Sequence, residues 1–300
     1  MKKIFVIIVT YNAMRWIDRC LQCLRESTVP VVPVVVDNGS TDGTREHIPS
    51  HFPEVVWLPQ GENLGFGQGN NVGIRYALQE QADYVMLLNQ DAYLDREAIS
   101  HLLAADDGHS MLSPLHLSGD GQRLDNSIRT ALYRAVSSSL FDDILIRHSL
   151  NTKYQVADVC AACWFLPMAI IRQIGGFNPI FFHYGEDNNF AHRLAYHHVP
   201  LYVIPSASMR HDRVEHGNLQ VYNRNRLRRE MLLVCCNINL GLKGIFVQLL
   251  RLLALSYAVD LPQRQYRIGA FLVNLFWLLA HLGQVSQSRR TDRQVSANWL

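Results

Sequence analysis

The sequence predicts an α/β protein with a mostly parallel sheet, flanked by helices, and a C-terminal helical segment. Three observations support this prediction. Short apolar runs without polar alternation, typical of strands buried on both faces, recur with helical segments between them in the first half of the chain. Polar residues and carboxylates follow the ends of these runs. Residues 221–300 are instead basic and apolar, with helical spacing.

The N-terminal part alternates predicted strands with predicted helices. The expected strands are residues 4–9, 31–36, 55–58 and 84–88. The expected helices are residues 16–25, a helix opened by the turn 39–44, and residues 70–79. Because crossover helices join parallel strands, this order predicts a parallel sheet with helices on both faces.

The sequence after residue 105 is less regular. Residues 105–155 are polar, with helical periodicity only over 131–146. A strand over 156–166, a helix over 188–196 and a short strand over 201–204 follow. We therefore divide the chain into a domain of residues 1–220, with halves of about 1–105 and 106–220, and a helical tail, 221–300.

Composition excludes several classes of protein. With 48% hydrophobic and 18% charged residues, the chain is not disordered, not collagen-like and not a coiled coil.

The net charge of +2 is unevenly distributed along the chain. Residues 1–204 hold 15 Lys+Arg and 21 Asp+Glu, whereas residues 205–300 hold 13 and 5. Such asymmetry indicates that the C-terminal end meets an anionic surface, either a membrane or nucleic acid.

Neither the N-terminus nor the cysteines predict an extracellular or zinc protein. The apolar run 4–9 is too short for a signal peptide, so we expect a buried strand in a protein that stays inside the cell. Two C-x-x-C pairs, at 20–23 and 160–163, have spacing compatible with zinc. We favour a core role for them, because Cys20 shares a helical face with apolar neighbours.

Polar groups gather where the predicted strands end. These segments are Thr10-Tyr11-Asn12, Asp37-Asn38, residues 63–73 and Asn89-Gln90-Asp91. In open parallel sheets, ligands bind outside the carboxyl ends of the strands. The sequence therefore predicts a polar, phosphorylated ligand at this edge.

The segment 63–73 places four glycines at the start of a helix. Free N–H groups at a helix start attract anions, and glycine lets backbone approach a ligand closely. The segment has no P-loop lysine and does not follow the first strand. A glycine-rich helix entry without a ligand is the alternative.

Three further positions carry chemistry, each with a structural alternative. Asp91 could bind a divalent cation through its carboxylate, or it could cap a turn. Glu186 and Asp187 follow an aromatic cluster and suit general base catalysis, or serve as helix N-terminal charge. His211 follows the last predicted strand and could return to the Asp91 edge, or be an ordinary solvated histidine.

Taken together, these segments resemble the inverting glycosyltransferases of family 2, which have the GT-A fold, and in particular the rhamnosyltransferase-like bacterial branch. The matching stretches, in the family's order, are residues 9–12, 36–44, 63–71, 87–92, 175–177, 181–187 and 210–211. Each is a weak signal, but the ordered set over residues 4–215 is highly specific.

The resemblance implies roles for individual residues. The nucleotide-binding positions are Thr10, Tyr11, Asp37, Asn63, Asn70 and Asn89. Asp91 and His211 would hold Mg²⁺ or Mn²⁺ on the diphosphate. Asp187 would be the catalytic base, supported by Glu186. Trp164, His183 and Tyr184 would lie on the acceptor side.

The sequence departs from the family pattern at three places. The common Asp-x-Asp reads Asn-Gln-Asp at 89–91, Asn70 replaces a frequent arginine, and Ala161-Ala162 replaces Gly-Ala. The first two changes remove a charged ligand and a positive charge. The base is retained, so the implied reaction is a single in-line displacement at the anomeric carbon.

The tail contains two apolar runs, 244–259 and 268–283, after the basic segment 224–229. Both are short for a membrane span and contain the polar residues Gln248, Arg251 and Asn274. They suit a helical hairpin at the membrane interface, anchored by Tyr257 and Trp277. The alternative is a pair of helices packed on the catalytic domain or on another subunit.

We therefore expect an enzyme at the cytoplasmic face of the membrane. It would transfer a sugar, rhamnose by family branch, from a dTDP- or UDP-linked donor to a saccharide or lipid-linked saccharide in cell-surface polysaccharide synthesis. Peripheral membrane contact would run through residues 224–283. A non-catalytic nucleotide-sugar-binding subunit of a glycan assembly complex is the second hypothesis. Nucleic acid is not expected as a partner, because aliphatic runs rather than exposed aromatics interleave the arginines.

Overall fold

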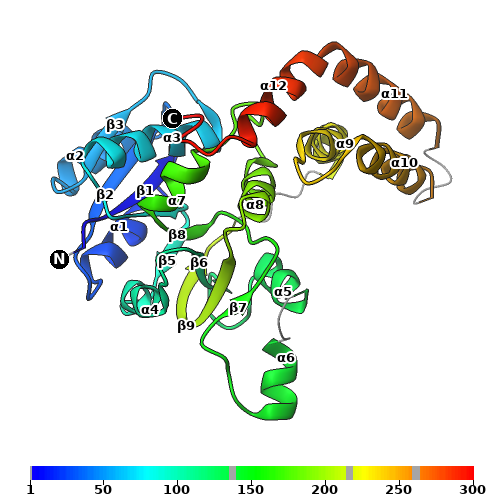
Figure 1. Ribbon diagram of the computed structural model, residues 1–300. Helices are drawn as coiled ribbons and strands as arrows, with labels where there is room; N and C mark the ends of the chain where they lie inside the picture. The colour runs from blue at the N-terminus through cyan, green and yellow to red at the C-terminus, as the bar shows by residue number, and fades with distance from the viewer. Residues whose placement is uncertain (1, 135–139, 214–218, 259–263) are drawn as a thin grey trace.

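A single mixed sheet forms the centre of the computed structural model, which describes residues 2–134, 140–213, 219–258 and 264–300 (Figure 1). The strands are β1 (Ile4–Thr10), β2 (Val32–Asp37), β3 (Val56–Pro59), β4 (Tyr84–Leu88), β5 (Ala92–Leu94), β6 (Met111–Ser118), β7 (Tyr154–Gln155), β8 (Cys163–Pro167) and β9 (Leu201–His211). Their order is β3-β2-β1-β4-β8-β6-β9-β5, and β7 pairs with β9. This fold is the predicted α/β class.

The two halves of the sheet differ in strand direction. β1 is parallel to both β2 and β4, and β3 is parallel to β2, as predicted. β8 is antiparallel to β4 and β6, while β9 is parallel to β6 and antiparallel to β5 and β7. The sheet is therefore parallel where the sequence showed strand–helix alternation, and mixed where it did not.

Helices cover both faces of the sheet. They are α1 (Ile17–Arg25), α2 (Thr44–His51), α3 (Gly65–Gln79), α4 (Ala98–Ala105), α5 (Asn126–Tyr133), α6 (Leu140–Asp142) with the π-helical turn η1 (Asp143–Arg147), α7 (Met168–Ile174) and α8 (Glu186–Tyr196). Alternate side chains of β1 enter different cores: Phe5 and Ile7 face α3, α7 and α8, while Val6 and Ile8 face α1, α2 and α4. Both faces are apolar because both are covered.

Several element boundaries differ from those predicted. α3 begins at Gly65, so the glycines lie within the helix, and α8 begins at Glu186. β9 continues to His211, because polar Ser208 and Arg210 alternate with buried Met209 and His211 beyond the apolar run. Of the strand expected over 156–166, only the last part is a strand, as β8, and the short β7 precedes the expected range.

The tail forms four helices, α9 (Leu219–Cys236), α10 (Leu242–Ala258), α11 (Arg264–Ala280) and α12 (Leu282–Asp292). Figure 1 shows α9, α10 and α11 lying beside the sheet domain and α12 leading back to it. A third apolar cluster joins α9 and α11 with Phe181, which precedes α8. None of the helices in the described part of the chain is long and apolar enough to cross a membrane.

A buried polar network fastens the chain after α11 to the catalytic domain. The Asp292 carboxylate accepts hydrogen bonds from Asn178 Nδ2 (3.0 Å), Asn189 Nδ2 (3.1 Å) and Trp299 Nε1 (2.9 Å). It lies 3.8 Å from Nε of Arg193, whose side chain is fully buried. Burial lowers the pKa of Arg193 to about 10. The buried cation is thus balanced by a carboxylate distant in sequence.

Candidate functional site

The sheet edge that we expect to face the nucleotide starts at the adjoining ends of β1 and β2. Thr10 and Asp37 are paired in the parallel register, and Thr10 Oγ1 donates to Asp37 Oδ1 at 3.0 Å. Ser40 Oγ donates to the same oxygen at 2.5 Å, and the Ser40 N–H donates to Asp37 Oδ2 at 3.1 Å. Arg45 Nε lies 3.8 Å from Asp37 Oδ2. Three hydrogen bonds and a cation therefore fix the buried carboxylate at this edge.

Gln90 holds the backbone of Tyr11, a role that the sequence did not indicate. Its Oε1 accepts from the Tyr11 N–H at 2.8 Å, and its Nε2 donates to the Tyr11 carbonyl at 3.3 Å. The Tyr11 ring remains 49% exposed. The loops after β1 and β4 are thereby joined, and an aromatic ring stays open to a ligand.

The glycines of α3 permit close packing. A Cβ at Gly69 would collide with Val9, and one at Gly73 would collide with Ile7, both on β1. At Gly65, where φ is +79°, a Cβ would collide with the Phe182 carbonyl. These glycines therefore bring α3 against the sheet and against the loop before α8, as the alternative of a glycine-rich helix entry allows, and their approach to a ligand stays a prediction.

The asparagines around α3 divide into two groups. Asn63 Oδ1 accepts from the Gly65 N–H at 2.8 Å and lies 3.5 Å from Asn38 Nδ2, at the start of the helix. Asn70 is buried and donates to the Phe66 carbonyl of its own helix at 3.0 Å. Asn70 is thus part of the helix packing, and its nucleotide contact stays a prediction, as for the equally buried Thr10 and Asp37.

The residues expected to hold a metal do converge. His211 pairs with Ala92 where β9 meets β5, and its Nε2 lies 3.4 Å from Asp91 Oδ1 and 3.4 Å from Asn89 Nδ2. Asn89 Oδ1 is buried without a hydrogen-bond partner among the described residues. No three His, Cys, Asp or Glu side chains within the described ranges form a metal cluster. These donors fit a cation whose other ligands are phosphate oxygens, as Mg²⁺ prefers.

Two residues that the sequence did not single out lie behind His211. Asp125 caps α5 through Ser127 and places Oδ2 3.5 Å from His211 Nδ1. Arg213 Nε lies 2.9 Å from the same nitrogen and 3.4 Å from Asp125 Oδ2. Burial acts to lower the pKa of His211, but hydrogen bonding to Asp125 and Asp91 outweighs it and raises the pKa. His211 therefore bridges two carboxylates.

Glu186 and Asp187 begin α8 after Gly185, whose φ of 97° favours glycine. Glu186 is buried beside Gly67 of α3, and its Oε2 has no hydrogen-bond partner within the described structure. Burial and the neighbouring Asp187 raise the pKa of Glu186 to about 7. Burial also raises the pKa of Asp187. Both carboxyl groups are thus made more basic, as proton acceptors require.

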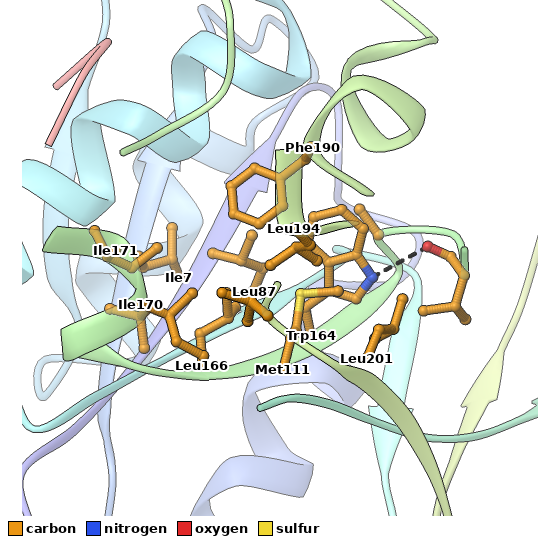
Figure 2. Packing of buried hydrophobic residues seen from close by; sticks show 14 of the residues in the cluster. Ile7, Leu87, Met111, Trp164, Leu166, Ile170, Ile171, Phe190, Leu194 and Leu201 are labelled. Atoms are coloured by element: carbon orange, nitrogen blue, oxygen red, sulfur yellow. Dashed lines mark hydrogen bonds between the residues drawn. The ribbon is translucent and has the colours of Figure 1, made fainter. Parts of the chain in front are cut away.

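The expected acceptor-side residues have different surroundings. His183 and Tyr184 are exposed in the loop before α8, with ring centroids 4.1 Å apart. Trp164 is fully buried: its indole stacks on Phe177, and Nε1 donates to the Val159 carbonyl at 3.2 Å. Figure 2 shows the Trp164 ring among apolar side chains beside Phe190. This corrects the expectation for Trp164, which packs in the core because it lies on a central strand.

Comparison with known proteins identifies the family. The model of "Glycosyl transferase family 2" matches residues 5–175. The chain belongs to glycosyl transferase family 2. The match spans β1 to the end of α7, and the family-level prediction is therefore confirmed.

Individual relatives agree with this family assignment. An N-acetylglucosaminyl-diphospho-decaprenol L-rhamnosyltransferase of Mycobacterium tuberculosis is 29% identical over 230 residues, which cover 69% of this chain and 75% of the relative. A dTDP-rhamnosyl transferase of Shigella flexneri is 32% identical over 33% of each chain.

A solved structure shares the fold of this glycosyltransferase. The mannosyltransferase of Pyrobaculum calidifontis, solved with GDP-Man and Mn²⁺, aligns with a TM-score of 0.61 and 16% identity over 97% of this chain and 86% of that one. The GT-A fold expected from the sequence is confirmed.

Proposed function

We propose that this glycosyltransferase transfers rhamnose from a dTDP-linked donor to a lipid-diphosphate-linked saccharide, with inversion at the anomeric carbon. The main supporting observation is the position of Glu186 and Asp187, which α3 packing holds beside the nucleotide edge. The names of the two relatives support the sugar and the acceptor class. The intact carboxylate pair makes a non-catalytic binding subunit the weaker hypothesis.

The reaction follows from the chain's own residues. Thr10, Asp37 and the exposed Tyr11 ring orient the nucleoside at the edge of the sheet. Asp187 accepts the proton of an acceptor hydroxyl, whose oxygen forms the new bond to the anomeric carbon as the bond to the diphosphate breaks. Burial raises the pKa of Asp187, and burial together with the neighbouring Asp187 raises the pKa of Glu186. The nucleoside diphosphate departs on the opposite face of the sugar.

Asp91, Asn89 and His211 would hold Mg²⁺ or Mn²⁺ at the diphosphate. When bound, the ion supplies positive charge that stabilises the leaving group. The Mn²⁺ bound in the mannosyltransferase structure supports a divalent ion at this fold. Asp125 orients the His211 ring from the other side.

Substitution of Asp91 tests this assignment. We expect Asp91→Asn to weaken Mn²⁺ binding in the presence of dTDP by about tenfold or more, because an anionic ligand is lost from the site. Titration of Mn²⁺ by electron paramagnetic resonance measures the change. Asp95→Asn, four residues further along the chain and outside the site, is the control. Unchanged Mn²⁺ affinity in Asp91→Asn would remove this residue from the site.

The donor and acceptor are tested directly with purified protein. We expect transfer from dTDP-rhamnose to a short-chain polyprenyl diphosphate sugar to exceed transfer from UDP- or GDP-linked sugars, with rhamnose in the opposite anomeric configuration in the product. Mass spectrometry and NMR of the product report the linkage. Binding of donors without any transfer would favour the non-catalytic hypothesis.

We also propose that α10 and α11 contact the cytoplasmic surface of the membrane. Their outer faces expose the apolar residues Leu242, Phe246, Val247, Leu250, Leu272, Val273, Phe276 and Leu279. Lys243 and Arg251 are exposed on α10, and neither helix contains an acidic residue. Exposed apolar stripes with cations beside them suit an anionic lipid surface.

The polar residues of these helices do not disrupt the apolar faces. Asn274 is buried and accepts from Arg228 Nε at 3.0 Å, so it faces α9. Trp277 is partly buried and stacks on His281, whereas Phe246 and Phe276 are exposed on the described parts of α10 and α11. We therefore assign the main anchoring role to these two phenylalanines rather than to Trp277. The side chains of Tyr257 and Arg224, also expected to contribute, lie outside the described residues.

Vesicle binding tests the membrane proposal. We expect the protein to sediment with vesicles of phosphatidylglycerol and phosphatidylethanolamine. The double variant Phe246→Asp/Phe276→Asp should bind these vesicles at least about tenfold more weakly, because it removes two aromatic side chains that would enter the lipid. The control is Leu145→Asp/Ile146→Asp, which alters equally exposed apolar residues near η1. Equal losses in both variants, or no vesicle binding by the unaltered protein, would contradict the proposal.

A further inference from the structure

Helix α9 brings an arginine to the loop that precedes the catalytic carboxylates. The Arg229 guanidinium carbon lies 5.2 Å from the centroid of the Tyr184 ring. A Cβ added to Gly185 would lie 3.1 Å from Arg229 Cγ, so the aliphatic stem runs along the backbone of that glycine. The tail therefore forms part of the wall beside α8.

The loop is shaped to display its aromatic residues at this point. Tyr184 has a φ of 64°, which is rare for a bulky residue, and Gly185 has a φ of 97°. Phe181, at the other end of the loop, is buried against α9 in the third apolar cluster. Packing on α9 thus stabilises a loop that leaves Tyr184 53% exposed next to a cation.

The charge of Arg229 acts on the groups around it. Burial lowers the pKa of His183, and the positive charge of Arg229 lowers it further. The same charge also opposes the rise in the pKa of Glu186 and Asp187, though more weakly than burial. Because Arg229 contacts Gly185, directly before Glu186 and Asp187, a ligand whose sugar hydroxyl reaches Asp187 would pass beside the guanidinium.

We propose that Arg229, with Tyr184, forms a subsite for the diphosphate of a lipid-linked acceptor. This inference rests on the proposed function. The donor diphosphate is expected at the other side of the site, beside Asp91 and His211. In a lipid-linked sugar, the diphosphate lies between the sugar and the lipid. Helix α9, which carries Arg229, correspondingly lies between α8 and α10 (Figure 1). Arg229 itself contacts Tyr184 and Gly185, directly before the carboxylates of α8.

The chemistry of the two side chains fits this ligand. A guanidinium forms paired, charge-assisted hydrogen bonds with phosphate oxygens. Stacking on Tyr184 pre-orients the guanidinium plane and so reduces the entropy lost on binding. A lysine would retain the charge but not the paired geometry.

The test compares two acceptors that carry the same sugar. One is a short-chain polyprenyl diphosphate sugar, and the other is a neutral alkyl glycoside. We expect Arg229→Ala to raise KM for the diphosphate acceptor about ten- to a hundredfold, with less than about a twofold change for the neutral glycoside. We expect Arg229→Lys to give an intermediate KM. Arg226→Ala, three residues away and paired with Glu230 on the same helix, should behave as the unaltered protein.

Each outcome has a distinct meaning. Equal increases in KM for both acceptors in Arg229→Ala and in Arg229→Lys would show that Arg229 only supports the loop, and would overturn the subsite. Unchanged KM values in both variants would overturn it as well. Absence of transfer to either acceptor by the unaltered protein would instead overturn the proposed function. Donor hydrolysis without acceptor, measured for each variant, reports whether the nucleotide site is intact.

Discussion

We expect Asp187→Asn to lower kcat for sugar transfer by about 10²- to 10⁴-fold, because the amide cannot accept the proton of the acceptor hydroxyl. Donor binding should remain, since Asp187 lies on α8 rather than at the edge formed by Thr10 and Asp37. The Asp187 Oδ1 accepts from the Asn188 N–H at 2.8 Å, and the Asn carbonyl can replace it in that bond. Transfer rates and calorimetric titration with the donor measure the two effects.

Glu186→Gln is the matched variant. Its side chain is buried beside Gly67 and is the less accessible of the two carboxyl groups. We expect it to lower kcat by only about tenfold, consistent with a supporting role rather than proton transfer. If Glu186→Gln lost transfer while Asp187→Asn retained it, the roles of the two carboxylates would be exchanged. Full activity of Asp187→Asn alone would remove Asp187 from the mechanism.

We expect Asp292→Ala to lower the free energy of unfolding by about 3–5 kcal/mol, because it leaves the fully buried Arg193 without its carboxylate. It also deprives Asn178, Asn189 and Trp299 of a common hydrogen-bond acceptor. Urea unfolding followed by circular dichroism measures the loss. Arg193 retains its bonds to the Ile174 and Gly176 carbonyls, so the cation stays in place and unpaired.

Two further variants make the stability measurement interpretable. Glu54→Ala removes an exposed ion pair with Arg25, in which N and O lie 2.6 Å apart, and should cost less than about 1 kcal/mol. Asp292→Asn keeps the shape and some hydrogen bonds and should fall between the two. An Asp292→Ala protein as stable as Glu54→Ala would show that the buried network does not hold the tail to the catalytic domain.

Much of the half over residues 1–105 was predictable because its signals are local. The apolar runs of β1, β2 and β4 and the spacing of α1 each occupy one continuous stretch, and parallel strands necessarily end at the same edge. The contacts between Thr10 and Asp37 and between Asp91 and His211 agree with that expectation. The proton-transfer and ligand roles of these residues stay predictions.

The half of the domain over residues 106–220 was less predictable, because its strands pair across long sequence separations. β6 combines apolar and polar residues, and β9 does so beyond its apolar run 201–204, although the two strands lie side by side in the sheet. The last strand was predicted to end at residue 204 rather than at His211 because its second part alternates polar and buried residues. Trp164 was misplaced because an aromatic residue on a central strand has the same local signal whether it faces a ligand or the core.

The sequence by itself determined the fold class, the family and the sheet edge that gathers polar groups, because periodicity and ordered motifs are read along the chain. Only the tertiary structure decided which side chains face that edge. It placed Asn70 inside, Gln90 against Tyr11, Asp125 behind His211 and Arg229 beside Tyr184. The last three are contacts between residues far apart in sequence, and the direction of a buried side chain depends on packing that leaves no periodic pattern in the chain.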